Sequence, residues 1–225
     1  MPRPSLKFCS NARSDGLPFI VEELLAADAA AAPVPPTLAE LVAGRLAALP
    51  DDQRPVLLAA ATLGGDPDWR LLGPVTGADE RTVLAALRAA TEVGLLLTDA
   101  GRLRWRHALT RAAVLATLLP PERAALAAGA AQALDERGEP ADRADAARLF
   151  VESGDRRRAA TILLALASDD AGRGALHSAS ELLERAAGTG QLAGPVTVER
   201  VRVLTLLGHP ADAIEAGEAA LGTDT

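Results

Sequence analysis

From Gly94 to Leu119 the chain reads GLLLTDAGRLRWRHALTRAAVLATLL, and within this stretch the spacing of the apolar residues changes from a strand pattern to a helix pattern. The apolar run LLL is followed by TDAG, a turn composition in which Gly101 can take the positive φ that closes a hairpin. Residues 102–106 (RLRWR) then alternate, with leucine and tryptophan on one face and three arginines on the other. The pattern predicts a half-buried two-stranded ribbon.

After the ribbon the apolar spacing becomes helical, so His107 lies at a strand-to-helix junction. Side chains three and four positions apart share one face of a helix. The expected apolar stripe consists of Leu109, Ala112, Ala113, Ala116 and Leu119.

The composition favours a mainly α-helical fold. The chain has 225 residues, of which 49% are hydrophobic but only 2% aromatic, so small side chains allow close packing of helices and argue against an aromatic-rich β sandwich. The formal net charge of −7 argues against a nucleic-acid or anionic-membrane binder. No apolar run approaches the roughly 18 residues of a membrane span.

The termini and the single cysteine favour a cytoplasmic protein. No continuous apolar segment follows the first residues, so we expect no signal peptide. Cys9 is alone, which excludes an internal disulfide and fits a reducing compartment. Residues 1–13 are polar and basic, and we expect a disordered tail there.

Several helices are expected before the ribbon. Thr37 and Glu40 have the spacing of a capping box, which predicts a helix from there to about Leu49. Three further helices are expected at about 50–63, 68–75 and 79–93, the last with Val83, Leu84, Leu87 and Ala90 facing inward. Three helices followed by a two-stranded ribbon is the order of a winged-helix domain, which we assign to residues 50–118.

A winged helix usually binds DNA through its third helix, but the charges here are unsuited to that role. That helix carries Asp79, Glu80 and Glu92 against Arg81 and Arg88, so it has no net positive charge to meet phosphates. The arginine row of the ribbon is the one basic feature, and such a row is usually a solvated face. We therefore expect no direct DNA contact by this domain.

Residues 119–225 are expected to form a TPR-like arm of α-α repeats. Gly174–Ala186 aligns with Gly208–Ala220, and the matched glycine, alanine and glutamates recur after 34 residues, the tetratricopeptide period. A weaker echo begins at Gly154. Because Thr225 follows the last repeat without an obvious polar cap, we expect the arm to be truncated.

The motifs of catalysis and metal binding are missing from the sequence. It contains no GxxxxGK[ST] phosphate-binding loop, and its three histidines have none of the spacings of zinc sites. His177 and His209 are expected to be exposed at repeat turns, and adjacent carboxylates are expected on solvated faces. By spacing alone, His107 is most simply a structural histidine at a helix start. We expect no catalytic residue and no metal site.

Three segments, RSDGLPFIVEELL (residues 13–25), VPPTL (34–38) and LRWRHALTR (103–111), together resemble the large ATP-binding regulators of the LuxR family, which belong to the signal-transduction (STAND) ATPases with numerous domains. The resemblance covers nearly everything after about Ala12. In that family a nucleotide-binding domain ends in a helical lid, followed by a winged helix, a helical-repeat arm and a C-terminal helix-turn-helix that binds DNA. The resemblance implies that residues 14–49 are a remnant of the ATPase lid with a linker helix.

The resemblance also implies two cofactor-binding residues. Residues 16–19 (GLPF) resemble the Gly-Leu-Pro motif of the lid, whose proline packs against adenine, and this role falls on Pro18. The histidine that opens the helix after the wing resembles one that contacts the β-phosphate of ADP in related switch ATPases, and this role falls on His107, although its flanking residues differ from the Met-His-Asp form. A donor there would join two domains while the diphosphate is bound.

Three functions follow as hypotheses. In the first, the chain is the central fragment of such a regulator, a switch and interaction module that works with the family's nucleotide-binding and DNA-binding domains and with a protein or small-molecule inducer at the arm. ATP or ADP is then the cofactor of the full-length family, and the isolated chain is expected to bind ADP at millimolar affinity or worse. The alternative is a free-standing winged-helix DNA-binding protein with a helical dimerisation tail. The third is an enzyme with His107 as a base.

Overall fold

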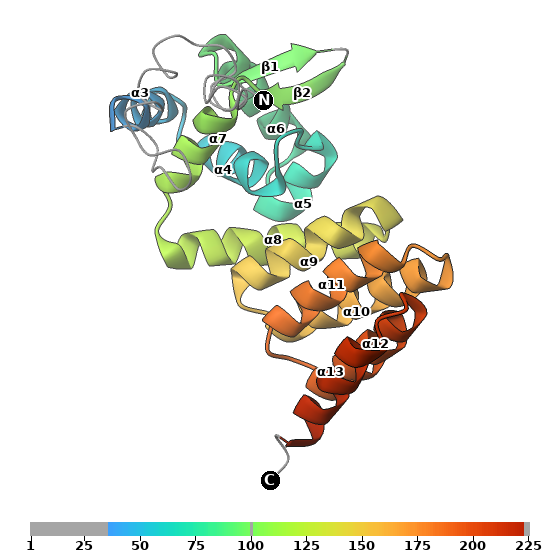
Figure 1. Ribbon diagram of the computed structural model, residues 1–225. Helices are drawn as coiled ribbons and strands as arrows, with labels where there is room; N and C mark the ends of the chain where they lie inside the picture. The colour runs from blue at the N-terminus through green and yellow to red at the C-terminus, as the bar shows by residue number, and fades with distance from the viewer. Residues whose placement is uncertain (1–35, 100, 223–225) are drawn as a thin grey trace, which may run out of the picture. The chain divides into compact units, whose positions relative to one another are not determined.

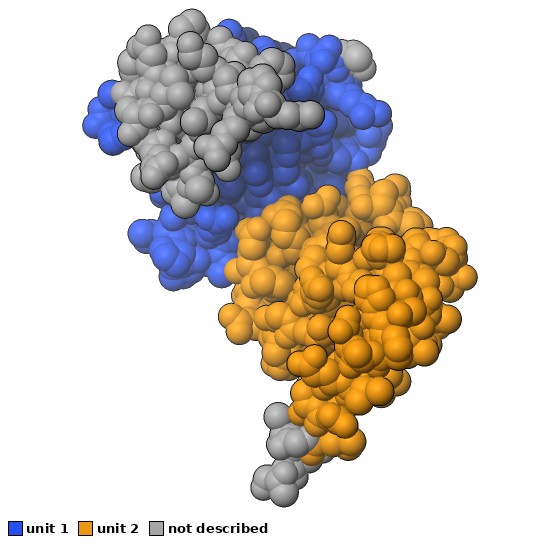
Figure 2. All heavy atoms as spheres, in the orientation of Figure 1, with its two compact units in different colours: residues 1–126 blue, residues 127–225 orange. Residues whose placement is uncertain are grey.

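The computed structural model describes residues 36–99 and 101–222, and this part of the chain is mainly α-helical with one two-stranded antiparallel sheet (Figure 1). It forms two compact units, residues 1–126 (unit 1) and 127–225 (unit 2), coloured separately in Figure 2. The boundary falls within one helix, α8 (Pro120–Arg137). None of the described helices is both long enough and apolar enough to cross a bilayer.

Unit 1 contains the helices and the ribbon that were expected there. Its elements are α3 (Pro36–Ala47), α4 (Arg54–Leu63), the 3-10 helix η1 (Trp69–Leu71), α5 (Leu72–Thr76), α6 (Glu80–Glu92), β1 (Leu96–Asp99), β2 (Arg102–Trp105), α7 (Ala108–Ala116) and the start of α8. Thr37 is not an N-cap, because it lies inside α3, whose described part starts at Pro36. Proline suits the first turn of a helix because its missing N–H has no partner there anyway.

Helix α4 is the centre of unit 1. It contacts α5, α6 and α7, and Val56, Leu57 and residues 59–61 have no exposed surface. The alanines at 59–61 allow these neighbours to approach closely on several sides, so more of the helix is buried than a single stripe would be.

A glycine cap ends α5 and a side-chain cap begins α6. Gly77 takes the left-handed conformation (φ 74°) after α5, and the Asp79 side chain accepts a hydrogen bond from the Thr82 N–H at 2.7 Å. That hydrogen bond lowers the pKa of the Asp79 carboxyl. The expected inner face is correct except at Leu84, which is 43% exposed, whereas Ala86 is fully buried in its place. The buried stripe of α6 therefore lies slightly to one side of the predicted one.

The ribbon has the predicted turn and alternation. Leu96 pairs with Trp105 and Asp99 with Arg102, and Gly101 has φ 77° in the turn between the strands. Burial is confined to the base, where Leu96 and Trp105 lie, so the ribbon is less buried than expected. The backbone N–H of Trp105 also donates to the Gly65 carbonyl at 3.2 Å, which ties β2 to the loop after α4.

Helix α7 follows the ribbon as predicted, but its buried face is different. The buried side chains are Thr110, Ala113, Val114 and Leu115, whereas Ala116 and Leu119 are exposed and Leu109 is only partly buried. The reason is that α7 packs against both α3 and α4, which fixes its rotation, and that the helix ends at Ala116. Alanine-rich sequence leaves several stripes of similar apolar character, so periodicity alone chose the wrong one.

Unit 2 is a series of helices in which, from α9 onward, each packs on the next along the chain (Figure 1). After the end of α8 its elements are η2 (Pro140–Asp142), α9 (Arg143–Ser153), α10 (Arg156–Gly172), α11 (Leu176–Gly188), α12 (Ala193–Leu206) and α13 (Pro210–Gly222). Its core is built mostly from alanine and leucine, with Leu149, Leu163 and Leu183 almost completely buried.

The 34-residue period recurs in the backbone hydrogen bonds. At the α10–α11 turn the Ala175 N–H donates to the Asp170 carbonyl at 2.9 Å, and at the α12–α13 turn the His209 N–H donates to the Leu204 carbonyl at the same distance. The glycines of the two turns, 174 and 208, both have φ 80°. Each turn therefore ends its helix with the same left-handed glycine cap.

The weaker echo at Gly154 does not fit this period. Gly154 follows α9 and lies only 20 residues before Gly174, so its place in the series matches that of Gly190, which follows α11. The turn that precedes Gly174 by about one period is at Gly138, 36 residues earlier, after α8, where φ is 70°. The weaker sequence match therefore paired two different kinds of turn, one that follows α9 or α11 and one that follows α10 or α12.

Candidate functional site

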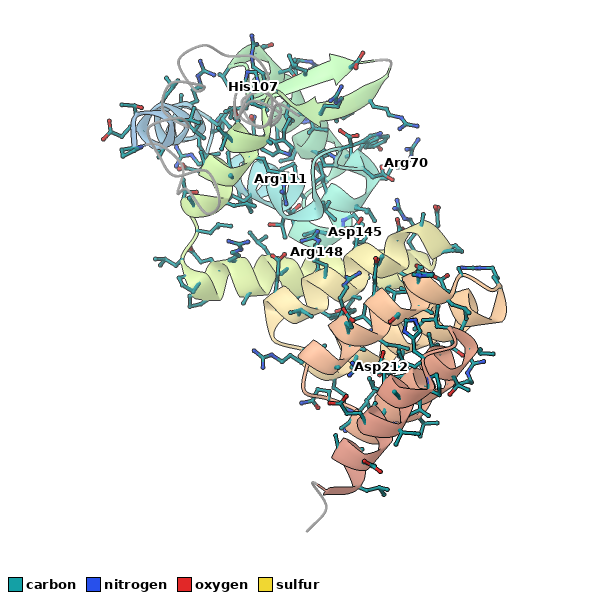
Figure 3. All side chains as sticks on the ribbon, viewed as in Figure 1. Arg70, His107, Arg111, Asp145, Arg148 and Asp212 are labelled. Atoms are coloured by element: carbon teal, nitrogen blue, oxygen red, sulfur yellow. The ribbon has the colours of Figure 1, made fainter. Side chains whose placement is uncertain are left out.

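His107 is the residue that links the ribbon to α7, as its label in Figure 3 shows. Its backbone is extended (φ −146°, ψ 147°), and its carbonyl accepts hydrogen bonds from the Thr110 and Arg111 N–H groups at 3.0 and 3.3 Å. The side chain does not cap the helix, and its Nδ1 atom is buried. The imidazole therefore does not satisfy the backbone N–H groups in the first turn of α7.

His107 lines a cavity of about 450 Å³ in unit 1. Three segments far apart in the sequence form its wall: α3, the end of α6 with the residues after it, and the start of α7. The lining residues are Thr37, Leu38, Leu41, Val42, Arg45, Glu92, Val93, Gly94, Arg106, His107 and Thr110. Its apolar side chains come mainly from α3. Its two cationic side chains come from α3 (Arg45) and from the residues just before α7 (Arg106).

Two guanidinium groups converge on Gly94 within this cavity. A Cβ atom placed on Gly94 would lie 3.6 Å from Nη1 of Arg106 and 3.7 Å from Nη1 of Arg45. Gly94 itself has φ 71° and ends α6, with the next N–H, that of Leu95, donating to the Ala90 carbonyl at 2.9 Å. Arg45 is 49 positions away in the sequence, so folding alone brings the two arginines together.

The two arginines have no acidic partner among the described residues, in contrast to Arg54, Arg70 and Arg104 of unit 1. Nη1 of Arg104 lies 3.2 Å from Oδ2 of Asp99, and its Nε lies 3.5 Å from Oδ1 of Asp66. Nη1 of Arg54 lies 2.9 Å from Oδ1 of Asp51. No described carboxylate lies within 4.0 Å of Arg45 or Arg106, although Glu92 lines the same cavity. Two like charges at short range repel unless an anion or water screens them.

Most of the polar side chains that line the cavity can donate hydrogen bonds, which suits the retention of an anion rather than proton abstraction. Arginine presents a planar fork of N–H groups that matches two oxygens of a carboxylate or phosphate. The site thus has the chemistry of a binding pocket. Sequence reasoning assigned a role to His107 but treated Arg106 as a solvated ribbon residue and gave Arg45 no role.

The other residues singled out by the sequence lie elsewhere. Pro18 is outside the described residues. His177 and His209 are exposed in unit 2, as expected, and His209 Nδ1 lies 3.5 Å from an oxygen of Asp212. They line a second cavity, of about 560 Å³, between α11, α12 and α13. Among the described residues no three histidine, cysteine or carboxylate side chains are grouped to hold a metal ion.

Comparison with known proteins gives no relative of this chain: no protein-family model matches it, and neither a curated protein nor a solved structure is significantly similar to it. The resemblance to LuxR-family regulators therefore stays a prediction carried by the three sequence segments.

Proposed function

We propose that the chain is a regulatory switch and interaction module of an ATP-binding LuxR-type transcriptional regulator, in which unit 1 responds to bound nucleotide and unit 2 is the sensor arm. The observation that carries this proposal is the position of His107 in a 450 Å³ cavity beside Arg45 and Arg106. The motifs predict that His107 contacts a phosphate, and this histidine lies near cationic side chains, which favour the binding of a phosphate.

In this proposal residues 50–118 are a winged helix that does not read DNA. The order of α4, α5, α6 and the ribbon supports the assignment, as does the Trp105–Gly65 hydrogen bond, which is placed where a short third strand would pair. Arg104 of the ribbon is engaged by two aspartates, which reduces the positive charge available to a phosphate backbone. The domain instead transmits the nucleotide state.

Residues 119–225 act in this proposal as a TPR-like arm that meets a protein or small-molecule inducer. The hydrogen bonds repeated 34 residues apart support a stacked-repeat architecture. A phosphate-binding loop and a DNA-binding helix-turn-helix come from other domains of the regulator, so ATP or ADP is a cofactor of the assembled regulator rather than of this chain alone.

A titration of the chain with ADP, followed by 1H–15N NMR, tests the role of His107. We expect perturbed resonances at residues 92–95 and 105–111 with a dissociation constant of about 1 mM or weaker, since this corresponds to roughly 4 kcal/mol, which a few side chains can supply. His107→Ala should weaken binding, whereas His177→Ala, on an exposed face of α11, should leave it unchanged.

Two results would count against the proposal. Binding of ADP that is equal in the wild type and in His107→Ala would remove His107 from the switch. A salt-dependent mobility shift with duplex DNA would instead favour the free-standing winged-helix DNA binder, because phosphate contacts release counterions on binding. The neighbouring coding sequence gives an independent check, through an upstream phosphate-binding loop and a downstream helix-turn-helix.

A further inference from the structure

We propose that Arg45 and Arg106 form a phosphate-binding pair that holds the diphosphate of the nucleotide in the cavity beside His107. The nature of the ligand rests on the proposed function, whereas the pairing of the two arginines rests on the geometry of unit 1. Neither arginine was assigned a role by the sequence motifs.

The first argument is convergence. Arg45 lies in the last turn of α3 and Arg106 follows β2, yet their Nη1 atoms approach the same side of Gly94. The Arg106 N–H donates to the Leu95 carbonyl at 3.0 Å, and α3 packs against α7, so both side chains start from ordered backbone. Positions fixed in this way lower the entropy cost of forming a two-armed anion site.

The second argument is charge. Within the described lining of the cavity, two arginines face one carboxylate, Glu92, and this carboxylate is not within ion-pair distance of either arginine. The cavity therefore has an excess of positive charge even with a neutral imidazole. The N-terminal end of α7, at His107, adds the positive end of a helix dipole.

The third argument is the shape of the cavity. Its volume of about 450 Å³ lies within the range of small-molecule sites, and Leu38, Leu41 and Val42 add apolar surface from α3, the helix that also carries Arg45. A diphosphate attached to a less polar group fits this lining, because the anion meets the arginines while the remainder lies against the apolar side chains. Gly94 contributes by leaving free the space that a side chain would fill.

The test uses the full chain at low ionic strength, with inorganic pyrophosphate, ADP and adenosine as separate probes followed by calorimetry and NMR. We expect Arg45→Gln and Arg106→Gln each to weaken pyrophosphate and ADP binding about tenfold, the loss of one charge-assisted hydrogen-bonded contact. Adenosine should bind too weakly to measure. Arg102→Gln, an exposed ribbon arginine of the same type, should bind as the wild type does.

The lysine variants Arg45→Lys and Arg106→Lys guard against a folding artefact, because they retain the charge and the aliphatic stem. We expect them to recover part of the lost affinity, since an ammonium group cannot make the forked contact. Thermal unfolding checks that every variant is folded. Unchanged pyrophosphate binding in both glutamine variants, or no pyrophosphate binding by the wild type, would overturn the inference.

The results also separate this inference from the proposed function. One outcome is that pyrophosphate binding depends on the arginines, while ADP binds no more tightly than pyrophosphate and its affinity is unchanged in His107→Ala. That outcome would support the anion site and contradict the nucleotide switch. If ADP binding depends on His107 but not on Arg45 or Arg106, then the switch stands and the arginine pair is wrong.

Discussion

Arg111 shows how a single side chain fixes two helices of unit 1 (Figure 3). From its place on α7 its Nε–H donates to the carbonyl of Ala61 at 2.7 Å, across 50 positions of sequence. Ala61 lies in the last turn of α4, where carbonyl groups lack partners within the helix. The guanidinium group of Arg111 therefore caps the C-terminal end of α4 and ties it to α7, the helix that directly follows His107.

We expect Arg111→Met to destabilise the protein by about 1.5–3 kcal/mol, the typical contribution of a hydrogen bond to a charged group. Urea unfolding followed by circular dichroism measures the change. The matched control is Arg88→Met, which removes an exposed arginine from α6 and should cost little. Equal effects of the two substitutions would show that the Ala61 contact contributes nothing measurable.

Asp170 is the residue whose ionisation is most clearly tied to a turn of unit 2. The Ser178 hydroxyl donates to its carboxylate at 2.6 Å, and Arg173 forms an ion pair with it. These interactions, the Ser178 hydrogen bond above all, lower the pKa of Asp170 below its ordinary value of 3.8. The carboxylate joins the end of α10 to the start of α11.

The pH dependence follows from the lowered pKa. The unfolded chain takes up a proton at Asp170 at a higher pH than the folded chain, so this stabilisation is present above pH 3.8 and is lost as the pH falls below that value through the folded pKa. We expect Ser178→Ala to reduce the unfolding free energy at neutral pH and the deficit to shrink in acid. Ser180→Ala, also on α11, should show no such trend; a pH-independent deficit in Ser178→Ala would contradict the assignment.

The sequence predicted one residue of the candidate site, His107, but not the arginines that lie beside it. His107 was placed correctly at the strand-to-helix junction, because the change of period locates that junction within the sequence. Arg45 could not be found, since its relation to Gly94 depends on the packing of α3, and nothing in the local sequence reports that packing. A glycine before a strand was the one available signal, and it also has the simpler meaning of a helix end.

At the scale of elements, turns were predicted more reliably than buried faces. Gly101, Gly174 and Gly208 all have positive φ where the sequence placed turns or helix ends, because glycine adopts this conformation without a Cβ clash. The faces of α6 and α7 were displaced at Leu84 and Leu109, since alanine is compatible with either side of a helix. Tertiary contacts then decide which side is buried.

The equivalence of the two repeat turns gives a prediction about elements. Gly174→Ala and Gly208→Ala should each cost about 1–2 kcal/mol, because an L-residue is strained at φ 80°. The two costs should agree within experimental error in urea unfolding. Gly172→Ala is the control, because this glycine lies within α10 with no atom near its Cβ position, so it should stabilise by up to about 1 kcal/mol. Clearly unequal costs at 174 and 208 would show that the turns differ energetically.

At the scale of the whole molecule, the chain has two cores with different side chains. Unit 1 buries Leu57, Leu72 and Leu96, whereas unit 2 buries Leu149 and Leu183 among alanines. Composition predicted a mainly helical protein, and the described residues confirm that prediction. The boundary inside α8 was not visible, since a continuous helix carries no turn signal at that point.

Separate cores lead to a prediction for hydrogen exchange. Leu72→Ala and Leu183→Ala should each cost about 2–5 kcal/mol, since both side chains are fully buried. We expect Leu72→Ala to raise amide exchange mainly in α4, α5 and α6, and Leu183→Ala mainly in α10, α11 and α12. Mass spectrometry of exchanged peptides measures both patterns. A uniform rise along the whole chain in either variant would indicate one cooperative unit.

If the proposed repeat arm is correct, the matching glycine caps at 174 and 208 also bear on how unit 2 can change in length over evolution. Because each turn is closed by bonds within its own few residues, duplication or loss of one complete 34-residue block leaves every remaining joint unaltered. Removal of a single residue inside a helix would instead rotate all later side chains by roughly 100° and bury the wrong ones. Variation in the reach of the arm is therefore expected to come in whole blocks.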